Sequence, residues 1–279
     1  MPEVTSNRTD KAGKSHWDSA WLQAPLPPSI DPSAPGLNNY TNRAFHEYLC
    51  HAFSGMATRG KKLLEVGCGN SVLLPYLARQ FGFQVHGLDY SDLGCAKARQ
   101  ILEREGVDGE IHCEDFFSPS TALIGRFDVV FSWGVAEHFE STTACLSAFA
   151  RFLRPGGTMI TIVPNLVGLV GHLQEALDRA VYAIHVPLDR EALGEAHRQA
   201  GLQPLSCDYV MLFNLNVVNL EGKRGCRWYP AAVRLRSWVS KGVWMLESAL
   251  PFGHPNRFTS PLVACIAAKA TGEPETRCA

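Results

Sequence analysis

Two glycines and a downstream aspartate are the residues of this chain whose types and spacing best indicate chemistry. Residues 63–70 read Leu-Leu-Glu-Val-Gly-Cys-Gly-Asn, and Asp89 stands at the end of the next apolar run. Glycines permit a tight turn and let a ligand approach the backbone, because no Cβ is in the way. An acid that ends the second strand is placed to hold the hydroxyls of a ribose. The pattern therefore predicts a site for an adenosine-containing cofactor.

The spacing of the glycines distinguishes between kinds of cofactor. Dinucleotide-binding turns follow G-x-G-x-x-G, and here Val72 stands where the third glycine belongs. The segment instead resembles motif I of the class I S-adenosylmethionine-dependent methyltransferases, an acid followed by x-G-x-G-x-G, with Ser71 in place of the last glycine. The matching positions are Glu65, Gly67 and Gly69, and Cys68, between the glycines, is expected to bind the cofactor with them. The resemblance implies that the turn lies against the amino acid part of S-adenosyl-L-methionine, that Glu65 anchors its amino end, and that Asp89, followed by Tyr90, binds the ribose.

Three later segments resemble motifs of the same family, in the same order along the chain. They are Cys-Glu-Asp-Phe at 113–116, Phe-Asp-Val-Val-Phe at 127–131 and Leu-Arg-Pro-Gly-Gly-Thr at 153–158. The resemblance implies that Asp115 accepts a hydrogen bond from the adenine amino group. Phe116 either stacks on the adenine or fills the core, and both readings stay open. For Asp89 and Asp115 the structural alternative is an ordinary acid at the start of a helix or loop.

The segment 133–139, Trp-Gly-Val-Ala-Glu-His-Phe, follows the fourth apolar run directly. In open α/β sheets ligands bind beyond the carboxyl ends of the strands, so we expect this segment to line the site of methyl transfer. Trp133 is expected against the cofactor, and Glu137 and His138 against the methyl acceptor. His138 has an ordinary pKa suited to general base catalysis at neutral pH. The alternative is a histidine that hydrogen-bonds a loop backbone and only lines the pocket.

Six further side chains are candidates for the substrate pocket. They are Trp17, Trp21, Tyr40, Arg43, Asn165 and His185. Aromatic rings ahead of the first strand would cover a sulfonium well, because a cation over a ring is stabilised. The alternatives are packing of this arm on the sheet edge, and capping or turn roles for the Asn and His. No group of His, Asp and Glu has the spacing of a metal-binding motif, so we expect no metal.

Composition describes an ordinary globular protein and excludes little else. The 279 residues are 46% hydrophobic and 19% charged, with a net charge of -1, which gives no case for a nucleic acid partner. Nine scattered cysteines without a C-x-x-C pair argue against zinc or a disulfide framework and favour a reducing, cytoplasmic location. No run reaches the length of a membrane span, and we expect no signal peptide.

The elements that must position these residues alternate along the chain. Strands are expected at 62–66, 83–88, 110–113, 127–132, 158–163, near 203–213 and at 261–269, with helices at 39–55, 71–81, 92–106, 141–153 and 188–200. The alternation predicts an α/β fold with a parallel sheet. The resemblance, which spans roughly residues 60–270, implies the Rossmann-like seven-stranded methyltransferase sheet, mostly parallel with the last strand antiparallel.

Four regions are expected around this sheet. Residues 1–59 form an N-terminal arm and lid helix, 60–213 the S-adenosylmethionine-binding core, 214–260 an inserted cap, and 261–279 the final core strand and tail. Within the arm, prolines at positions 25–35 argue against a regular element, although Trp17, Trp21 and Leu22 are spaced like one helical face. The run 228–250 is apolar and contains basic residues. Four roles stay open for it: a core-facing cap, a dimer face, a cover over the substrate, or a peripheral membrane contact.

These observations together predict an S-adenosylmethionine-dependent methyltransferase. The enclosing arm and cap favour a small molecule that accepts the methyl group on O, N, S or C by in-line transfer. The protein would act as a monomer or homodimer. Two alternatives remain: a catalytically inactive cofactor-binding regulator, against which the acids at 65, 89 and 115 argue, and a nicotinamide oxidoreductase, against which Val72 argues.

Overall fold

The structure, a computed structural model, describes residues 9–250 and 253–271 and is built on one seven-stranded sheet. The strand order is β3-β2-β1-β4-β5-β7-β6, with β7 antiparallel to both of its neighbours and the other pairs parallel. The strands are β1 (Lys62–Val66), β2 (Gln84–Asp89), β3 (Gly109–Cys113), β4 (Phe127–Trp133), β5 (Leu153–Pro164), β6 (Leu202–Val210) and β7 (Leu262–Lys269). The predicted α/β class, the seven strands and the antiparallel last strand are confirmed.

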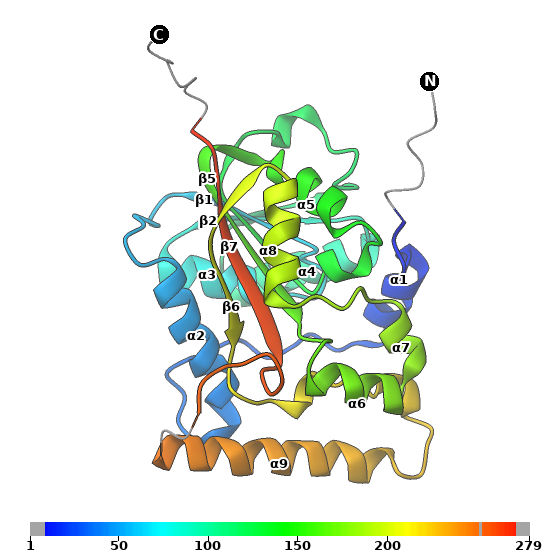
Figure 1. The fold of residues 1–279 in the computed structure, drawn as a ribbon. Helices are drawn as coiled ribbons and strands as arrows, with labels where there is room; N and C mark the ends of the chain where they lie inside the picture. Colours follow the sequence, from blue (N-terminus) through cyan, green and yellow to red (C-terminus); the bar gives the residue numbers. More distant parts are fainter. Residues whose placement is uncertain (1–8, 251–252, 272–279) are drawn as a thin grey trace.

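Helices cover both faces of the sheet, as Figure 1 shows. The helices are α1 (Lys14–Gln23), α2 (Tyr40–Ala52), α3 (Leu73–Phe81), α4 (Asp92–Glu105), α5 (Thr142–Ala150), α6 (Leu169–Leu177), α7 (Arg179–Ala183), α8 (Arg190–Gln199) and α9 (Tyr229–Ala249). Apolar side chains of α2, α3 and α4 form one buried cluster with the sheet, and those of α5 and α8 form another on its opposite face. The core therefore has three layers, and the carboxyl ends of the parallel strands share one edge.

The helix ends follow the chemistry of the sequence. The Ser91 hydroxyl caps α4 by accepting a hydrogen bond from the Gly94 N–H at 3.0 Å, and Gly106 ends that helix with a φ of 60°. Gly82 ends α3 in the same left-handed conformation, with a φ of 75°. One expected boundary is wrong: residues 154–157 belong to β5, with a register shift opposite β4, and are not a turn between α5 and the strand.

Helices α1, α6 and α7 were not among the expected elements, and α1 departs furthest from the expectation. The prolines keep residues 24–36 largely irregular, with only a turn at their end, but the ten residues 14–23 precede Pro25 and form a helix. None of its residues is fully buried, yet its side chains lie against α4 and the carboxyl ends of β2 and β4. The division of the chain into arm, core, inserted cap and final strand stays a prediction, and residues 1–8, 251–252 and 272–279 lie outside the described part.

A disulfide links Cys207 of β6 to Cys265 of β7. The two residues are directly opposite in the antiparallel register, a proximity that their separation of 58 positions hides in the sequence. This single pair was not expected from the scattered cysteines, although it is not a disulfide framework, because the remaining cysteines in the described residues are free. No helix in the described part of the chain combines the length and the apolarity needed to cross a membrane.

Candidate functional site

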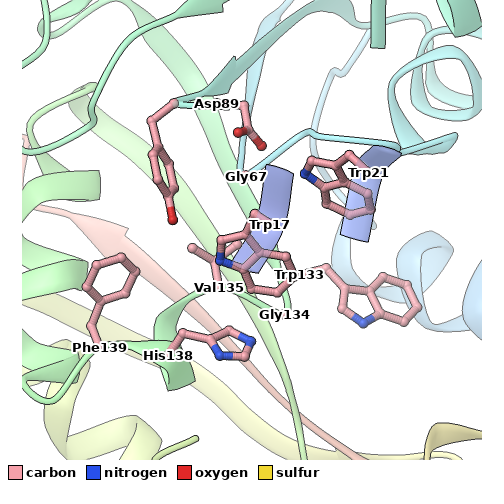
Figure 2. Close-up of a pocket in the computed structure, with 10 residues that line it drawn as sticks. Trp17, Trp21, Gly67, Asp89, Trp133, Gly134, Val135, His138 and Phe139 are labelled. Atoms are coloured by element: carbon pink, nitrogen blue, oxygen red, sulfur yellow. The ribbon is translucent and has the colours of Figure 1, made fainter. Parts of the chain in front are cut away.

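Two adjoining cavities open at the carboxyl ends of the strands. The first, here the glycine-turn cavity, has a volume of about 100 Å³ and is shown in Figure 2. Its lining residues are Trp17, Trp21, Gly67, Asp89, Tyr90, Trp133, Gly134, Val135, His138 and Phe139. The second, here the histidine cavity, has a volume of about 330 Å³ and is lined in part by Glu137, His138, Gln174, His185 and Asn219. Both cavities include Trp133, Gly134 and His138 in their walls, so they meet at the end of β4.

The first glycine of the turn is required by backbone conformation and by packing. Gly67 has a φ of 76°, and its N–H donates to the Leu88 carbonyl at 2.7 Å, which fixes the turn to the end of β2. A Cβ built at this position would lie 2.4 Å from Cγ2 of Val135, which comes from the loop after β4. A side chain at position 67 would therefore have a strained backbone conformation and would displace the loop after β4. The glycine allows the turn after β1 to pack directly against that loop.

Asp89 lies in the wall of the glycine-turn cavity and also braces the turn. One carboxylate oxygen accepts from the Gly69 N–H at 2.9 Å, and the other accepts from the Ser91 N–H at 2.8 Å. Burial raises the pKa of Asp89, and these two backbone hydrogen bonds oppose that rise. Beside it, the Tyr90 hydroxyl donates to Asp10 at 2.6 Å. These two N–H groups thus orient the Asp89 carboxylate at the position where the sequence predicts ribose binding.

Trp133 also lines the glycine-turn cavity as predicted, whereas four other predicted cofactor residues do not. Glu65 is buried behind the turn, where burial raises its pKa to about 8. Cys68 is buried toward the sheet, since a Cβ at Gly87 would meet its sulfur at 2.6 Å. Asp115 is exposed and accepts from the Phe117 N–H at 2.8 Å. Phe116 packs edge-on against Phe139 and Phe149 in the core, the second of its two expected positions.

The two tryptophans of α1 lie over the glycine turn. A Cβ at Gly69 would lie 2.7 Å from the Trp21 ring, so the absence of a side chain makes room for that indole. Trp17 stacks on Trp21 at 5.8 Å between ring centroids and meets the His138 ring edge-on at 5.0 Å. Figure 2 shows both indoles beside Gly67 and Asp89. The structure therefore places both indoles at the predicted cofactor side, where they could cover a sulfonium, although they were also candidates for the substrate pocket.

The segment before α1 ties this helix to the active edge of the sheet. Asp10 forms an antiparallel bridge with Phe139, and the Lys11 N–H donates to the His138 carbonyl at 2.8 Å. The Lys11 ammonium donates to the His185 carbonyl at 2.9 Å. From α1 itself, Asp18 accepts from the Ser91 hydroxyl at 2.6 Å. The arm is thus held over the glycine-turn cavity by polar contacts near the surface, a kind of contact that is readily exchanged for water.

Glu137, His138 and His185 converge in the histidine cavity. The two imidazole centroids are 4.3 Å apart. Nδ1 of His138 pairs with the Ile184 carbonyl at 3.0 Å, and Nδ1 of His185 pairs with the Val181 carbonyl at 2.6 Å. Because a carbonyl only accepts, each Nδ1 carries the proton and each Nε2 presents a lone pair. The carboxyl group of Glu137 has one buried oxygen without a hydrogen-bond partner.

Burial controls the charge of this cluster. It lowers the pKa of His138 to about 3, with a further contribution from the neighbouring His185, and it also lowers the pKa of His185. Burial raises the pKa of Glu137 to about 8. At neutral pH all three groups are therefore uncharged. The ordinary histidine pKa assumed from the sequence does not apply to His138.

Two groups in the described residues have side chains that could hold a metal ion. Nitrogen or oxygen ligand atoms of Glu137, His138 and His185 lie within 4.8 Å of one another, and the same holds for a half-exposed group on β2 and β3. The members of the second group are His86, Glu110 and His112. Spacing along the chain predicted no such grouping. Both groups arise from tertiary contacts between separate elements, which sequence spacing does not report.

Three predicted pocket residues belong to neither cavity wall. Tyr40 stacks on Trp244 at 4.9 Å between centroids, and its hydroxyl donates to Glu247 at 2.5 Å. Arg43 donates to the Gly36 carbonyl at 2.9 Å. The buried Asn165 amide donates to the carbonyls of Arg257 and Ser260, at 2.8 and 2.9 Å. These side chains hold the arm and the cap in place.

The cavities also contain residues that the sequence analysis did not single out. Val135 and Phe139 lie in the expected segment after β4, so the end of that strand was a usable signal. Gln174 and Asn219 come from α6 and the cap. The Gln174 amide donates to the Asn219 carbonyl at 3.0 Å and accepts from its N–H at 2.7 Å. No motif marks this pair, because only the fold of the cap brings it to the cavity.

Comparison with known proteins places the chain in a family. Residues 39–206 match the family described as methyltransferase domain. The ubiquinone biosynthesis O-methyltransferase of Thiobacillus denitrificans is 32% identical over 155 residues, which cover 52% of this chain and 65% of that protein. The corresponding protein of Bordetella avium is 27% identical over 154 residues, with 52% and 64% covered. The chain thus matches less than two thirds of the length of these relatives.

Solved structures with the same fold include enzymes of different chemistry. The cyclase SpnF has a TM-score of 0.62 at 17% identity, covering 98% of this chain and 100% of SpnF. The geranyl diphosphate C-methyltransferase of Streptomyces coelicolor A3(2) has a TM-score of 0.57 at 12% identity, covering 96% of this chain and 100% of that enzyme. At these identities the likeness concerns the fold alone. The glycine turn, the acid after β2, the seven-stranded sheet and the family match together show that this chain belongs to the class I S-adenosylmethionine-dependent methyltransferases.

Proposed function

We propose that this chain transfers the methyl group of S-adenosyl-L-methionine to a small molecule held in the histidine cavity. The observation that carries the proposal is the meeting of two cavities at Trp133, Gly134 and His138, one beside Asp89 and the glycine turn and the other beside the two histidines. Donor and acceptor bound in these cavities would face each other at the end of β4. Such alignment is the main contribution that a protein makes to an in-line displacement.

The residues beside the glycine turn fit the cofactor in kind. Asp89 offers carboxylate oxygens for the ribose hydroxyls, and Gly67 exposes its backbone for close approach. When bound there, the cofactor would supply an already activated methyl group. The indoles of Trp17 and Trp21 and the phenol of Tyr90 supply aromatic surface for its sulfonium and adenine. Assignment of Glu65, Gly69 and Asp115 to the cofactor remains part of this proposal, through the position of the turn and the loop after β3, whereas Cys68 and Phe116 are buried in the core clusters.

For the acceptor we propose a hydroxyl group, deprotonated by His138. The Ile184 carbonyl accepts the proton on Nδ1 of His138, so Nε2 carries the lone pair. His138 lies in the wall that the two cavities share. The relatives named O-methyltransferases support an oxygen acceptor over nitrogen, sulfur or carbon. His185 and Glu137 would bind the acceptor's polar atoms beside His138.

A direct assay tests this function and its alternatives. Purified protein is incubated with methyl-labelled S-adenosylmethionine and catechol as the probe acceptor, and S-adenosylhomocysteine and labelled catechol ether are measured. We expect both products in equal amounts. Cofactor binding without either product, for catechol and for amine and thiol probes, would favour the inactive regulator. Tighter binding of NAD than of S-adenosylmethionine in calorimetry would favour the oxidoreductase.

Trp21 is expected to control entry of the cofactor. The glycine-turn cavity, at about 100 Å³, is smaller than the roughly 300–1,000 Å³ of typical ligand sites. Since the Trp21 ring fills the space over Gly69, it must shift for the cofactor to enter. We expect Trp21→Ala to raise the stopped-flow association rate of S-adenosylmethionine several-fold. Trp238→Ala, which removes an indole from the surface of α9, serves as the control and should leave the rate unchanged. An unchanged rate in Trp21→Ala would contradict this gating role.

The remaining proposals concern partners and location. We propose a monomer or homodimer without a nucleic acid partner, and a membrane contact that is peripheral, through residues 228–250. We also propose a cytoplasmic location, which the six free cysteines among the described residues support and the Cys207–Cys265 disulfide opposes.

A further inference from the structure

The outer face of α9 is an apolar surface without a partner in the described chain. Seven of the twelve large hydrophobic side chains that the described residues expose lie between positions 228 and 250. They are Trp228, Leu235, Trp238, Val239, Met245, Leu246 and Leu250, which we call the α9 outer face. Trp238 is 75% exposed and Leu235 is 66% exposed. So many large apolar groups on one element mark an interaction surface, whereas single exposed ones are normal.

The opposite face of α9 holds the helix firmly on the protein. The Trp244 indole N–H donates to the Phe213 carbonyl at 2.7 Å, and the Ser240 hydroxyl accepts from the Leu215 N–H at 2.9 Å. Tyr229, Ala232 and Val233 pack on the apolar cluster under α6. The helix therefore already packs on the protein through its inner side. The exposed outer face is not needed to hold α9 in place. In Figure 1 the helix lies along the outside of the molecule, below α6 and the strand ends.

The charges around the outer face select its partner. Arg227 and Arg234 are exposed, and Lys241 is half-buried on the same helix. The one acid among residues 227–250 is Glu247, which accepts the Tyr40 hydroxyl on the inner side. The outer face is thus apolar and basic, with no acid in it. A second copy of this chain would bring its own basic groups to the same surface, whereas a bilayer with anionic lipids offers both an apolar interior and negative headgroups.

We propose that the α9 outer face docks this protein on the surface of anionic phospholipid membranes. Its 21 residues would lie flat in the interface over about 31 Å, at 1.5 Å per residue. Trp238 and Leu235 enter the acyl boundary, and Arg234 and Lys241 remain at the headgroups. The inner face of α9 packs against Leu166 and Val217, which line the histidine cavity. Docking therefore brings the membrane surface next to the wall of that cavity.

Vesicle sedimentation of the full chain tests the docking. We expect binding to vesicles of phosphatidylcholine with phosphatidylglycerol, and at least tenfold weaker binding to phosphatidylcholine alone. Leu235→Glu with Trp238→Glu should reduce binding to the mixed vesicles at least tenfold. Leu205→Glu is the matched control, since Leu205 is 61% exposed on β6, away from α9, and should change nothing. Arg234→Gln with Lys241→Gln should reduce binding about tenfold and weaken its dependence on salt.

Two results would overturn the proposal. One is equal sedimentation of the wild type, the α9 variants and the Leu205→Glu control. The other is a homodimer in light scattering that Trp238→Glu converts to a monomer and that does not sediment with mixed vesicles, because the face would then be a dimer interface. Vesicle binding needs neither cofactor nor acceptor, so its failure is distinguishable from a failure of methyl transfer. Thermal unfolding of each variant shows whether it is folded.

Discussion

Replacing His138 by alanine is expected to lower kcat by about 10²–10⁴, the usual effect of removing a general base. Cofactor affinity should change little, because Nε2 of His138 lies at the junction toward the histidine cavity and Asp89 lies at the other end of the glycine-turn cavity. The measurement is steady-state kinetics with catechol, repeated with a chelator because Glu137, His138 and His185 could hold a metal ion.

The matched control is His172→Ala, which removes an exposed histidine of α6. It should leave both kcat and KM unchanged. A His138→Ala enzyme with a raised KM and a kcat near that of the wild type would contradict base catalysis and indicate a pocket wall instead. Loss of activity on chelation in the wild type, with no loss in His138→Ala, would assign the effect of the mutation to the metal.

The pH dependence of kcat should follow Glu137 rather than His138. With a pKa of about 3, His138 is unprotonated from pH 5 to 9, so no step is expected between pH 6 and 7, and it is a weak base until a nearby negative charge raises its pKa. Glu137 is protonated below its pKa of about 8 and ionised above it. Its negative charge would stabilise the imidazolium that forms on His138, so kcat should rise through pH 8. Glu137→Gln should remove this rise, and a step at pH 6–7 in the wild type would contradict the buried state of His138.

Replacing Asp89 by alanine is expected to weaken S-adenosylmethionine and S-adenosylhomocysteine equally, by roughly 10- to 150-fold, which corresponds to about 1.5–3 kcal/mol for charged hydrogen bonds. The two ligands share the ribose diol and differ only in the methyl group. Asp89→Ala also leaves the N–H groups of Gly69 and Ser91 without an acceptor, so the melting temperature should fall as well. Calorimetry with both ligands and thermal unfolding measure the two effects.

Asp92→Ala is the control for this prediction. It separates the loss of ribose binding from the general effect of removing a carboxylate near the start of α4. Its carboxylate is 86% exposed and pairs with Lys14 at 3.3 Å, so its removal should change stability little and leave affinity unchanged. An Asp89→Ala protein that is folded and binds S-adenosylhomocysteine as tightly as the wild type would refute the ribose assignment. An unequal loss for the two ligands would place Asp89 near the methyl group instead.

Much of the fold was predictable because its signals are local. The apolar runs of β1 and β4 are buried on both faces, and a strand of this kind reads as unbroken hydrophobic sequence. Helix ends at Gly82 and Gly106 were predictable because few residues other than glycine adopt the left-handed conformation found there. The error at residues 154–157 has a local cause too: Pro-Gly-Gly normally marks a turn, and a register shift in β5 accommodates it within the strand.

The chemistry at the strand ends was predictable only in part. Position after a strand was sufficient to expect Asp89, Trp133 and His138 at one edge of the sheet, since the carboxyl ends of parallel strands meet there. Position could not say which way Cys68 or Phe116 points, because a loop residue has no fixed periodicity. It also could not give the pKa of His138, which depends on burial beneath α1 and beside His185.

The sequence by itself determined the order of the strands and of the helices that alternate with them, the glycine turn and the acid that follows it, and hence the family. These features depend on residues that are neighbours in the chain or one crossover apart. Only the tertiary structure decided that Trp21 lies on Gly69, that Glu137, His138 and His185 converge, that Cys207 pairs with Cys265, and that one face of α9 stays bare. Each of these features depends on contacts between segments far apart in the chain. Packing and desolvation determine such contacts, and the local propensity of the residues does not.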